Sequence, residues 1–396
     1  MLTRLCLGLT LLAAPAVGQS FDTRAEAAYM IDQTTGTVLL EKNANEALPP
    51  ASMSKLMTLY MTFEAVADGR LTLGEELPVS AHAASFGGST MFLDTTDRVS
   101  VEDLIRGIIV LSGNDACVVL AEAISPDGTE AGFARMMTSR ARQLGMEDSV
   151  FQNSSGWPAA GHVMSMKDLA ILAERLIEDF PTYYPLFAEQ EFAFDGRAPA
   201  NTRNRNPLLG LGIGVDGLKT GHTQEAGFGL TGSAEQGDRR VIFVITGLDT
   251  AAQRAEEAER LVTWAFRQFA QKELGSAGTY IAEAPVWMGS KTSVDLVLPE
   301  DTDLLVPILN EDGVEATVSY RGPLEAPISE GDSVAELVIT FEGLPETRLP
   351  LVAGESIDRG GFTPTLRTAA QVLMEKAGLT EVIDTAAETL AVEPAS

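Results

Sequence analysis

Cysteine and histidine are scarce in this chain of 396 residues, which has two of the first and three of the second. Cys6 lies in an N-terminal segment that we expect to be removed, so Cys117 alone remains and no internal disulfide can form. The three histidines are isolated, without the i, i+4 spacing or the neighbouring cysteines of a zinc site: His82, His162 and His222. We therefore expect structural roles for their side chains, no metal, no cofactor, and a fold stabilised by an ordinary hydrophobic core.

Positive charge is also in short supply. The 28 lysines and arginines are set against 56 aspartates and glutamates, which gives a formal net charge of −28. Such an excess of carboxylates repels nucleic acid and opposes docking on anionic lipid. The sequence contains no basic stripe and no Gly-rich phosphate loop. We therefore exclude nucleic acid as a partner.

The apolar run at the N-terminus, residues 5–14, is too short to cross a bilayer, which takes about 20 residues. It follows Arg4 and ends before small residues at positions 16–18. A short positive start, an apolar core and a small-residue end are typical of a secretory signal peptide. We assign residues 1–18 to such a peptide and expect export to the periplasm. The alternative interpretation is a buried N-terminal helix.

Hydrophobic periodicity predicts a mixed α/β domain over residues 21–272. Residues 25–42 are typical of a β-hairpin, and residues 215–245 of an antiparallel ladder. Helices are expected at 101–111, 115–124, 130–144, 166–178 and 251–271. This order of strands, helical insertion, strands and terminal helix predicts helices packed against an antiparallel sheet.

The pattern changes after about residue 275. Residues 277–353 alternate apolar and polar positions in short runs separated by turn residues, which predicts a small all-β domain without a catalytic constellation. Residues 359–396 form a modest amphipathic segment followed by an acidic tail. Because its basic residues are few, peripheral contact with the inner membrane stays an open question.

A serine and a lysine begin an apolar stretch that predicts a buried helix over residues 53–63. Ser52 and Lys55 stand at i and i+3, on one face of its first turn. Burial lowers the pKa of a lysine, and a neutral amine beside Ser52 can take the hydroxyl proton. The alternative is that Ser52 is a plain N-cap.

Two further motifs have a chemical and an ordinary interpretation. Ser112 and Asn114 lie between two predicted helices, where they offer a hydroxyl and an amide to a cleft; the alternative is a loop in which Asp115 caps the next helix. The Lys219-Thr220-Gly221 run lies on a predicted strand whose edge can pair with a peptide. Gly221 would allow close backbone approach there. K-T-G alone is also an ordinary tripeptide.

Together, S-x-x-K at a helix start, S-x-N between helices and K-T-G on a strand resemble the motifs of penicillin-binding proteins and class A β-lactamases. The resemblance covers residues 25–272, and the low-molecular-mass D-Ala-D-Ala carboxypeptidase branch is the most similar. It implies a penicillin-binding/β-lactamase-like transpeptidase fold, and the small C-terminal all-β domain is typical of that branch. The implied activity is removal of the terminal D-Ala from peptidoglycan stem peptides, with inhibition by β-lactams.

The resemblance also implies a role for each site residue. Ser52 is the expected nucleophile, Lys55 its base, and Ser112 the relay to the leaving amine. Asn114 is expected to hydrogen-bond the substrate amide, and Lys219 to supply positive potential. The N–H groups of Ser52 and His222 are expected to form the oxyanion hole. Thr220 and Arg254 are expected to bind the substrate carboxylate, with Gly221 allowing close approach of the substrate backbone. Arg254 has an alternative as a surface residue paired with Glu256 or Glu257. Cys117 is expected in the core.

Three other functions stay open at this point. A serine β-lactamase would need an E-x-x-x-N run between the second and third motifs, and residues 150–190 have none. An endopeptidase acting on cross-linked wall would keep the same fold and motifs. A non-catalytic wall-binding module would have no reason to retain all three motifs.

Overall fold

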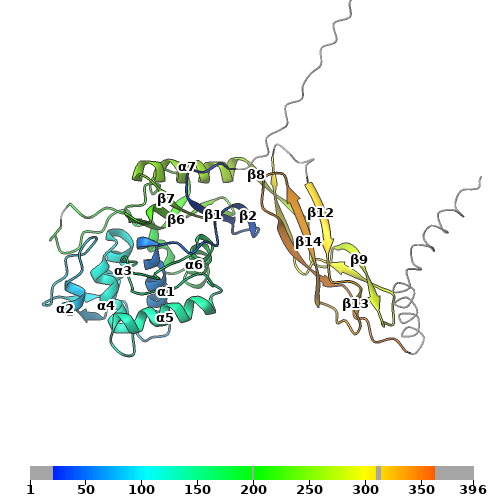
Figure 1. Ribbon diagram of the computed structural model, residues 1–396, viewed down its shortest axis with the longest axis horizontal. Helices are drawn as coiled ribbons and strands as arrows, with labels where there is room; N and C mark the ends of the chain where they lie inside the picture. Colours follow the sequence, from blue (N-terminus) through cyan, green and yellow to red (C-terminus); the bar gives the residue numbers. More distant parts are fainter. Residues whose placement is uncertain (1–20, 199, 309–313, 362–396) are drawn as a thin grey trace, which may run out of the picture. The chain divides into compact units, whose positions relative to one another are not determined.

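The computed structural model describes residues 21–198, 200–308 and 314–361 (Figure 1). The predicted signal peptide, and all but the first residues of the segment at 359–396, lie outside the described residues. The described chain divides into two compact units. The larger unit holds most of the chain up to Gln268, and the smaller unit holds most of the chain from Phe269 on, together with Asp32–Val38.

A five-stranded sheet, in the order β2-β1-β7-β6-β5, forms the centre of the larger unit. Its strands are β1 (Ala27–Asp32), β2 (Thr37–Lys42), β5 (Val215–Thr223), β6 (Gly227–Gln236) and β7 (Arg239–Leu248). β5, β6 and β7 pair antiparallel, and β5 is an edge strand. β7 is central, and all five residues of its apolar run, residues 241–245, are buried. The predicted hairpin and ladder are therefore confirmed.

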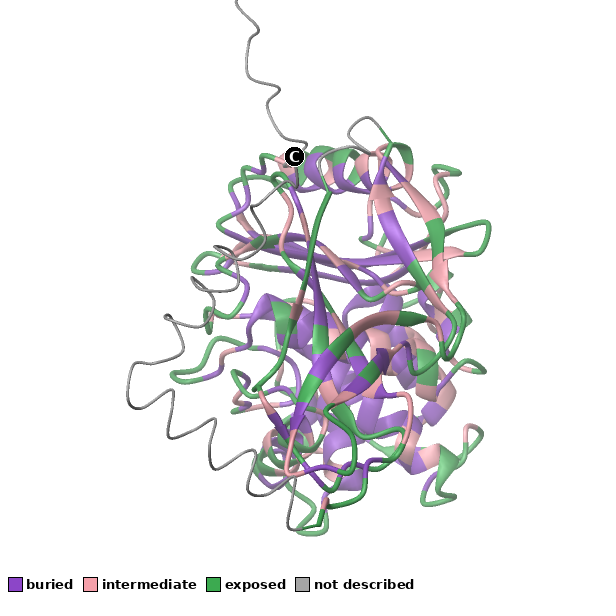
Figure 2. Cartoon of the chain, turned by 90° about the vertical axis from the view of Figure 1, so that its right-hand side faces the viewer, coloured by how far each residue is buried: buried purple, intermediate pink, exposed green. Residues whose placement is uncertain are grey.

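Helices cover both faces of this sheet, as Figure 1 shows. α7 (Ala251–Arg267) packs on one face, with the Thr250 hydroxyl accepting a hydrogen bond from Gln253 N–H as its N-cap. α1 (Lys55–Ala67) and α6 (Met166–Asp179) lie on the other face. α1 is buried on nearly every side, as its apolar pattern predicted. In Figure 2 the buried residues follow the sheet and these helices.

The helical insertion matches its predicted ranges closely. It comprises α3 (Val101–Arg106) with its continuation η2 (Gly107–Leu111), α4 (Asn114–Ile124) and α5 (Glu130–Gln143). Ser100 and Thr129 cap α3 and α5 through their hydroxyls. Smaller elements were not predicted: β3 (Glu76–Pro78), α2 (Ala81–Ala84), β4 (Arg98–Ser100) and η3 (Tyr184–Ala188).

The smaller unit is all-β in its described part, as predicted. Its six-stranded sheet has the order β12-β14-β15-β10-β9-β13, and β11 pairs with β8. The strands are β8 (Phe269–Gly275), β9 (Tyr280–Trp287), β10 (Ser293–Val297), β11 (Thr302–Pro307), β12 (Val314–Ser319), β13 (Leu324–Glu325), β14 (Ser333–Phe341) and β15 (Thr347–Ala353).

The prediction of a terminal helix reaching residue 271 was wrong at its end. α7 stops at Arg267, and residues 269–275 form β8, antiparallel to β11. The ladder with β11 buries Phe269 and Leu305. Residues 271–274, with a lysine, a glutamate and a leucine, favour a helix locally, so tertiary pairing overrides their propensity.

Candidate active site

Ser52 and Lys55 are joined by a hydrogen bond at the start of α1. Ser52 lies in the 3₁₀ turn η1 (Ala51–Ser54), which leads directly into the helix. The Lys55 Nζ atom donates to Ser52 Oγ at 2.8 Å and to the carbonyl oxygen of Ser155 at 2.6 Å. Lys55 is fully buried, and burial lowers its pKa to about 8. Near that pH the amine is neutral in about half of the molecules, so it can accept the Ser52 proton.

The loop at residues 153–157 places the carbonyl that holds Lys55. Asn153 Oδ1 accepts three backbone hydrogen bonds, from Ser155 at 3.2 Å, Gly156 at 2.8 Å and Trp157 at 3.1 Å. No role was predicted for this stretch, which lies between the helices expected at 130–144 and 166–178. The available signal was an asparagine followed by Ser-Ser-Gly, which is typical of an Asx turn.

Gly156 allows this loop to pack closely against Ala51, the residue before Ser52. Its φ is +74°, and a Cβ atom there would lie 1.9 Å from the carbonyl oxygen of Ala51. Ala51 itself has a φ of +48°, a strained value for a non-glycine residue. The backbone around Ser52 is thus held in an uncommon conformation by close packing.

His162 forms hydrogen bonds with Ser54, at the end of η1, and with the backbone of Gln152. Its Nδ1 atom accepts a hydrogen bond from Gln152 N–H at 3.2 Å, and its Nε2 atom lies 2.8 Å from Ser54 Oγ. Because Nδ1 accepts, Nε2 carries the proton and donates to Ser54. Burial, assisted by the charge of Lys55, lowers the His162 pKa to about 4, so the ring is neutral at physiological pH. These contacts give His162 the structural role that its isolation in the sequence indicated.

Ser112 has a strained backbone and an unpaired hydroxyl. Its φ of 62° and ψ of 35° are left-handed, and its side chain is buried. Its Oγ atom has no hydrogen-bond partner among the described residues. A buried hydroxyl without a partner is rare in native proteins and is typical of a group reserved for a ligand or for chemistry.

Asn114 and Asp115, at the start of α4, form hydrogen bonds with the backbone of residues 87–93. Asn114 donates from Nδ2 to the Gly87 carbonyl at 2.8 Å, and its Oδ1 atom accepts no hydrogen bond from a described residue. The Asp115 carboxylate accepts from the N–H groups of Met91 at 3.0 Å and Leu93 at 3.1 Å. Asp115 therefore anchors a distant segment rather than serving simply as a helix cap.

Lys219 and Gly221 lie on the face of β5 that packs against η1. Lys219 is buried, and burial with the nearby charge of Lys55 holds its pKa well below its usual range. Its Nζ atom makes a 3.3 Å hydrogen bond to the Thr220 carbonyl. A Cβ atom at Gly221 would lie 2.9 Å from the Pro50 carbonyl oxygen, so only glycine fits at this contact. The strand edge thus approaches the Ser52 turn closely.

Thr220 and His222 alternate with those residues and point to the other side of β5. The His222 ring stacks on Phe228, with centroids 3.8 Å apart. The Arg254 guanidinium, from α7, lies 5.8 Å from the centroid of the same Phe228 ring. These contacts bring β5, β6 and α7 together at His222, two residues along β5 from Thr220.

Arg254 is buried without an acidic partner among the described residues. Its Nη2 atom donates to the Arg205 carbonyl at 3.4 Å, and its Nε atom has no hydrogen-bond partner in the described chain. Burial lowers its pKa to about 10, and the charge of Arg205 acts in the same direction. Glu256 and Glu257 pair with Arg24 instead, so the structure does not support the alternative of a surface ion pair.

Cys117 lies in the core one helical turn after Asn114. It is fully buried, and burial raises the pKa of its thiol to about 12. The expectation of a core cysteine is confirmed. Within residues 21–198, 200–308 and 314–361, no group of three or more His, Cys, Asp and Glu side chains is arranged to hold a metal ion.

Fold and site together define a class. A mixed α/β domain presents a serine paired to a buried lysine, a buried Ser-x-Asn turn and a Lys-Thr-Gly strand edge, which is the arrangement of active-site serine enzymes with a penicillin-binding fold. The family model for D-alanyl-D-alanine carboxypeptidase matches residues 13–250. The model for the penicillin-binding protein 5 C-terminal domain matches residues 269–359. The chain belongs to the D-alanyl-D-alanine carboxypeptidase family.

Named relatives and solved structures agree with this assignment. The chain is 35% identical over 363 residues to D-alanyl-D-alanine carboxypeptidase DacC of Escherichia coli, covering 89% of each protein. Penicillin-binding protein 5 from Haemophilus influenzae superposes with a TM-score of 0.71 at 32% identity, covering 85% of this chain and 98% of that one. Penicillin-binding protein D2 from Listeria monocytogenes, in its ampicillin-bound form, has a TM-score of 0.56 at 34% identity and covers 62% of this chain and 98% of its own. The predicted family and fold class are confirmed.

Proposed function

We propose that this serine-type D-Ala-D-Ala carboxypeptidase releases the terminal D-Ala from peptidoglycan stem peptides through an acyl-enzyme on Ser52. The observation that carries the assignment of Ser52 is the 2.8 Å hydrogen bond between its hydroxyl and the buried Lys55 amine. No other serine with a described side chain has its Oγ atom paired with a lysine amine. A lysine whose pKa is lowered to about 8 suits the role of base near neutral pH.

In the acylation step, neutral Lys55 takes the proton of Ser52, and the oxygen attacks the carbonyl carbon of the penultimate D-Ala. The negative charge on the carbonyl oxygen is received by the N–H groups of Ser52 and His222, and each such donor is typically worth about 3–4 kcal/mol. When the peptide bond breaks, Ser112 passes a proton to the amine of the leaving D-Ala. Water then hydrolyses the ester and restores the Ser52 hydroxyl.

The substrate backbone is bound along the free edge of β5. Asn114 Oδ1, which has no donor among the described residues, accepts from a substrate N–H. Lys219 adds positive potential near Ser52 in its protonated form, which a bound substrate carboxylate favours against the effect of burial. The terminal carboxylate binds Thr220 and Arg254, whose buried Nε is unpaired in the described chain. A guanidinium is well suited to a carboxylate because it offers two parallel donors.

The membership in a carboxypeptidase family and the second, all-β unit favour this function over a serine β-lactamase. The site geometry does not separate a carboxypeptidase from an endopeptidase, since both cut after a D-Ala carbonyl. Membership in the carboxypeptidase family favours the carboxypeptidase. An intact Ser52–Lys55 pair argues against a non-catalytic wall-binding module.

One experiment compares these functions directly. The mature protein is incubated with a peptide ending in D-Ala-D-Ala, with a cross-linked dimer of that peptide, and with a fluorescent penicillin. The proposal expects D-Ala release from the linear peptide and a stable fluorescent adduct. Rapid hydrolysis of the penicillin with no D-Ala release would indicate a β-lactamase, and cleavage of the dimer alone would indicate an endopeptidase.

Export to the periplasm, where the substrate is located, is part of the proposal and rests on the sequence of residues 1–18. None of the helices described is both long and apolar enough to cross a membrane. Contact of residues 359–396 with the inner membrane stays a prediction, since nearly all of that segment is outside the described residues. Penicillin-binding relatives are consistent with β-lactams as inhibitors of this chain.

A further inference from the structure

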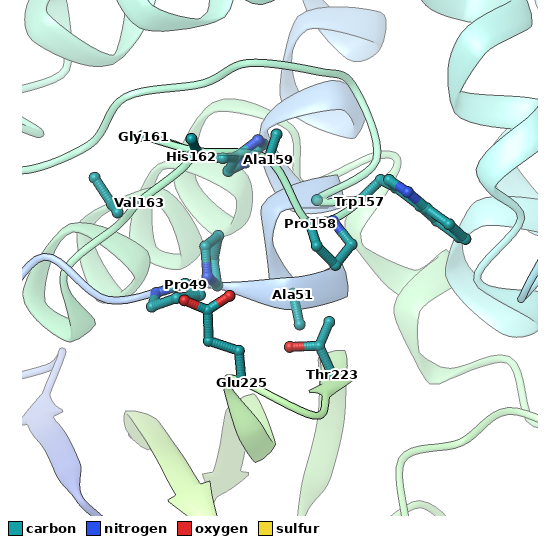
Figure 3. Close-up of a pocket in the computed structure, with 13 residues that line it drawn as sticks. Pro49, Ala51, Trp157, Pro158, Ala159, Gly161, His162, Val163, Thr223 and Glu225 are labelled. Carbon is teal, nitrogen blue, oxygen red and sulfur yellow. The ribbon is translucent and has the colours of Figure 1, made fainter.

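A cavity of about 420 Å³ lies directly beside the nucleophile turn. Its walls are the Pro49–Ala51 segment, the loop at residues 156–163, and two residues at the end of β5: Thr223, the last residue of the strand, and Glu225, just after it (Figure 3). Ala51, which lines the cavity, immediately precedes Ser52 in the chain, and Ser52 itself is not part of the lining. The cavity is on the Thr223 side of Gly221, whereas Thr220, where the proposed function binds the substrate carboxylate, is on the other side of Gly221 along β5.

The direction of the substrate follows from the proposed carboxylate site. A peptide whose C-terminus is bound beside Thr220, and whose scissile carbonyl lies at Ser52 near Gly221, runs antiparallel to β5 along its free edge. Its upstream residues then advance toward Thr223 by about 3.4 Å each. The one or two residues before the penultimate D-Ala therefore lie at the mouth of the cavity.

The cavity presents one ionised side chain. Of the thirteen residues that line it, only Glu225 carries a charge at neutral pH, because burial keeps His162 neutral. No lysine or arginine lines the cavity. Figure 3 shows the Glu225 carboxylate next to Pro49, facing the space below the loop at residues 157–161. Glu225 has no hydrogen bond or ion pair with any described residue, so its charge is available to a ligand.

We propose that this cavity is the acyl-side subsite, and that Glu225 binds the side-chain ammonium of the diamino acid that precedes D-Ala-D-Ala in a stem peptide. The inference rests on the proposed function and adds a specificity-determining residue to it. In a cross-linked stem peptide this amine has become an amide and carries no charge. Glu225 therefore favours stem peptides whose diamino acid is not cross-linked.

The test measures turnover of two peptides by the full-length protein. One is Nα-acetyl-Lys-D-Ala-D-Ala with a free side-chain ammonium, and the other is the same peptide acetylated at Nε. An exposed ion pair is worth up to about 1 kcal/mol, or about fivefold in kcat/KM. The wild type is expected to prefer the free amine by about threefold to fivefold. Glu225→Gln should remove this preference, so that kcat/KM becomes the same for the free-amine and the acetylated peptide. Glu147→Gln, at an exposed glutamate away from the cavity, controls for the loss of one negative charge.

A variant with the opposite charge at position 225 gives a second test of the subsite. Glu225→Lys should prefer a peptide succinylated at Nε, which carries a negative side chain, over the free amine. An equal rate on all peptides for the wild type, or an unchanged preference in Glu225→Gln, would overturn the subsite. Release of D-Ala without any preference would leave the carboxypeptidase function standing. Absence of D-Ala release from every peptide would instead contradict the function itself.

Discussion

The Lys55 amine lies 2.8 Å from the Ser52 hydroxyl and is held there by the Ser155 carbonyl at 2.6 Å. The start of α1 sets the i, i+3 spacing of the two side chains, and the Asn153 turn fixes the position of the carbonyl. Since Lys55 is fully buried, its charge is disfavoured and its pKa is lowered to about 8. The proposed base is therefore in contact with the proposed nucleophile before substrate binds.

The rate of acylation should rise with pH through about 8. Lys55 accepts a proton only when it is neutral, and the neutral fraction falls about tenfold for each pH unit below its pKa. The second-order rate constant for acylation by a fluorescent penicillin at pH 6 is therefore expected to be about 100-fold below its plateau above pH 9. A rate that is constant between pH 6 and pH 9 would rule out Lys55 as the base. Circular dichroism over the same range controls for unfolding.

Two glycines of one loop should respond differently to alanine. Gly156 and Gly161 have φ values of +74° and +77°, so each Ala variant incurs about 1–2 kcal/mol of left-handed strain. At Gly156 the new Cβ would also overlap the Ala51 carbonyl oxygen at 1.9 Å, whereas at Gly161 the nearest atom is 3.5 Å away. We expect Gly156→Ala to lose about 1–3 kcal/mol more stability in urea unfolding, and to be acylated more slowly. Equal losses would show that Gly156 does not hold the nucleophile turn.

The S-x-x-K, S-x-N and K-T-G motifs could be found from the sequence because each one is local. Ser52 with Lys55 is set by one helical turn, and the β1–β2 and β5–β6–β7 pairings follow from the hairpin and ladder patterns. The pairing of β1 with β7, which joins them into one sheet, was not predicted. The contacts of Ser155, His162 and Asp115 were not predictable in this way, since each connects residues that are far apart in the sequence. The end of α7 was missed for the same reason, because the pairing of β8 with β11 decides it.

Arg254→Ala should impair only substrates that have a free C-terminus. Truncating one partner of a desolvated charge pair costs about 2–4 kcal/mol, which is about 30-fold to 1,000-fold in kcat/KM for a D-Ala-D-Ala peptide. A peptide amidated at its terminus should already be poor and should lose little more on mutation, and this non-additivity couples the side chain to the carboxylate. If both peptides lose activity equally, Arg254 supports the fold and the carboxylate binds elsewhere.

A chain ending at Gln268 should retain D-Ala release from a soluble peptide. All proposed site residues precede Gln268, and the Listeria structure, of which 98% is covered, corresponds to only 62% of this chain. We expect kcat/KM within about threefold of the full-length value, because no site residue is removed. Circular dichroism establishes whether the shortened protein is folded. A folded but inactive product would show that the second unit contributes to the site.

The central claim is that Ser52 forms the acyl-enzyme. The direct measurement is peptide mass spectrometry of the protein after reaction with penicillin, with D-Ala release measured on the same preparations of wild type, Ser52→Ala and Ser54→Ala. The account predicts one adduct per chain on Ser52, and no adduct in Ser52→Ala, with turnover reduced by about 10⁶-fold as for other nucleophile deletions. Ser54→Ala should still be acylated at Ser52. An adduct on Ser54 or Ser112, or turnover that persists in Ser52→Ala, would contradict it.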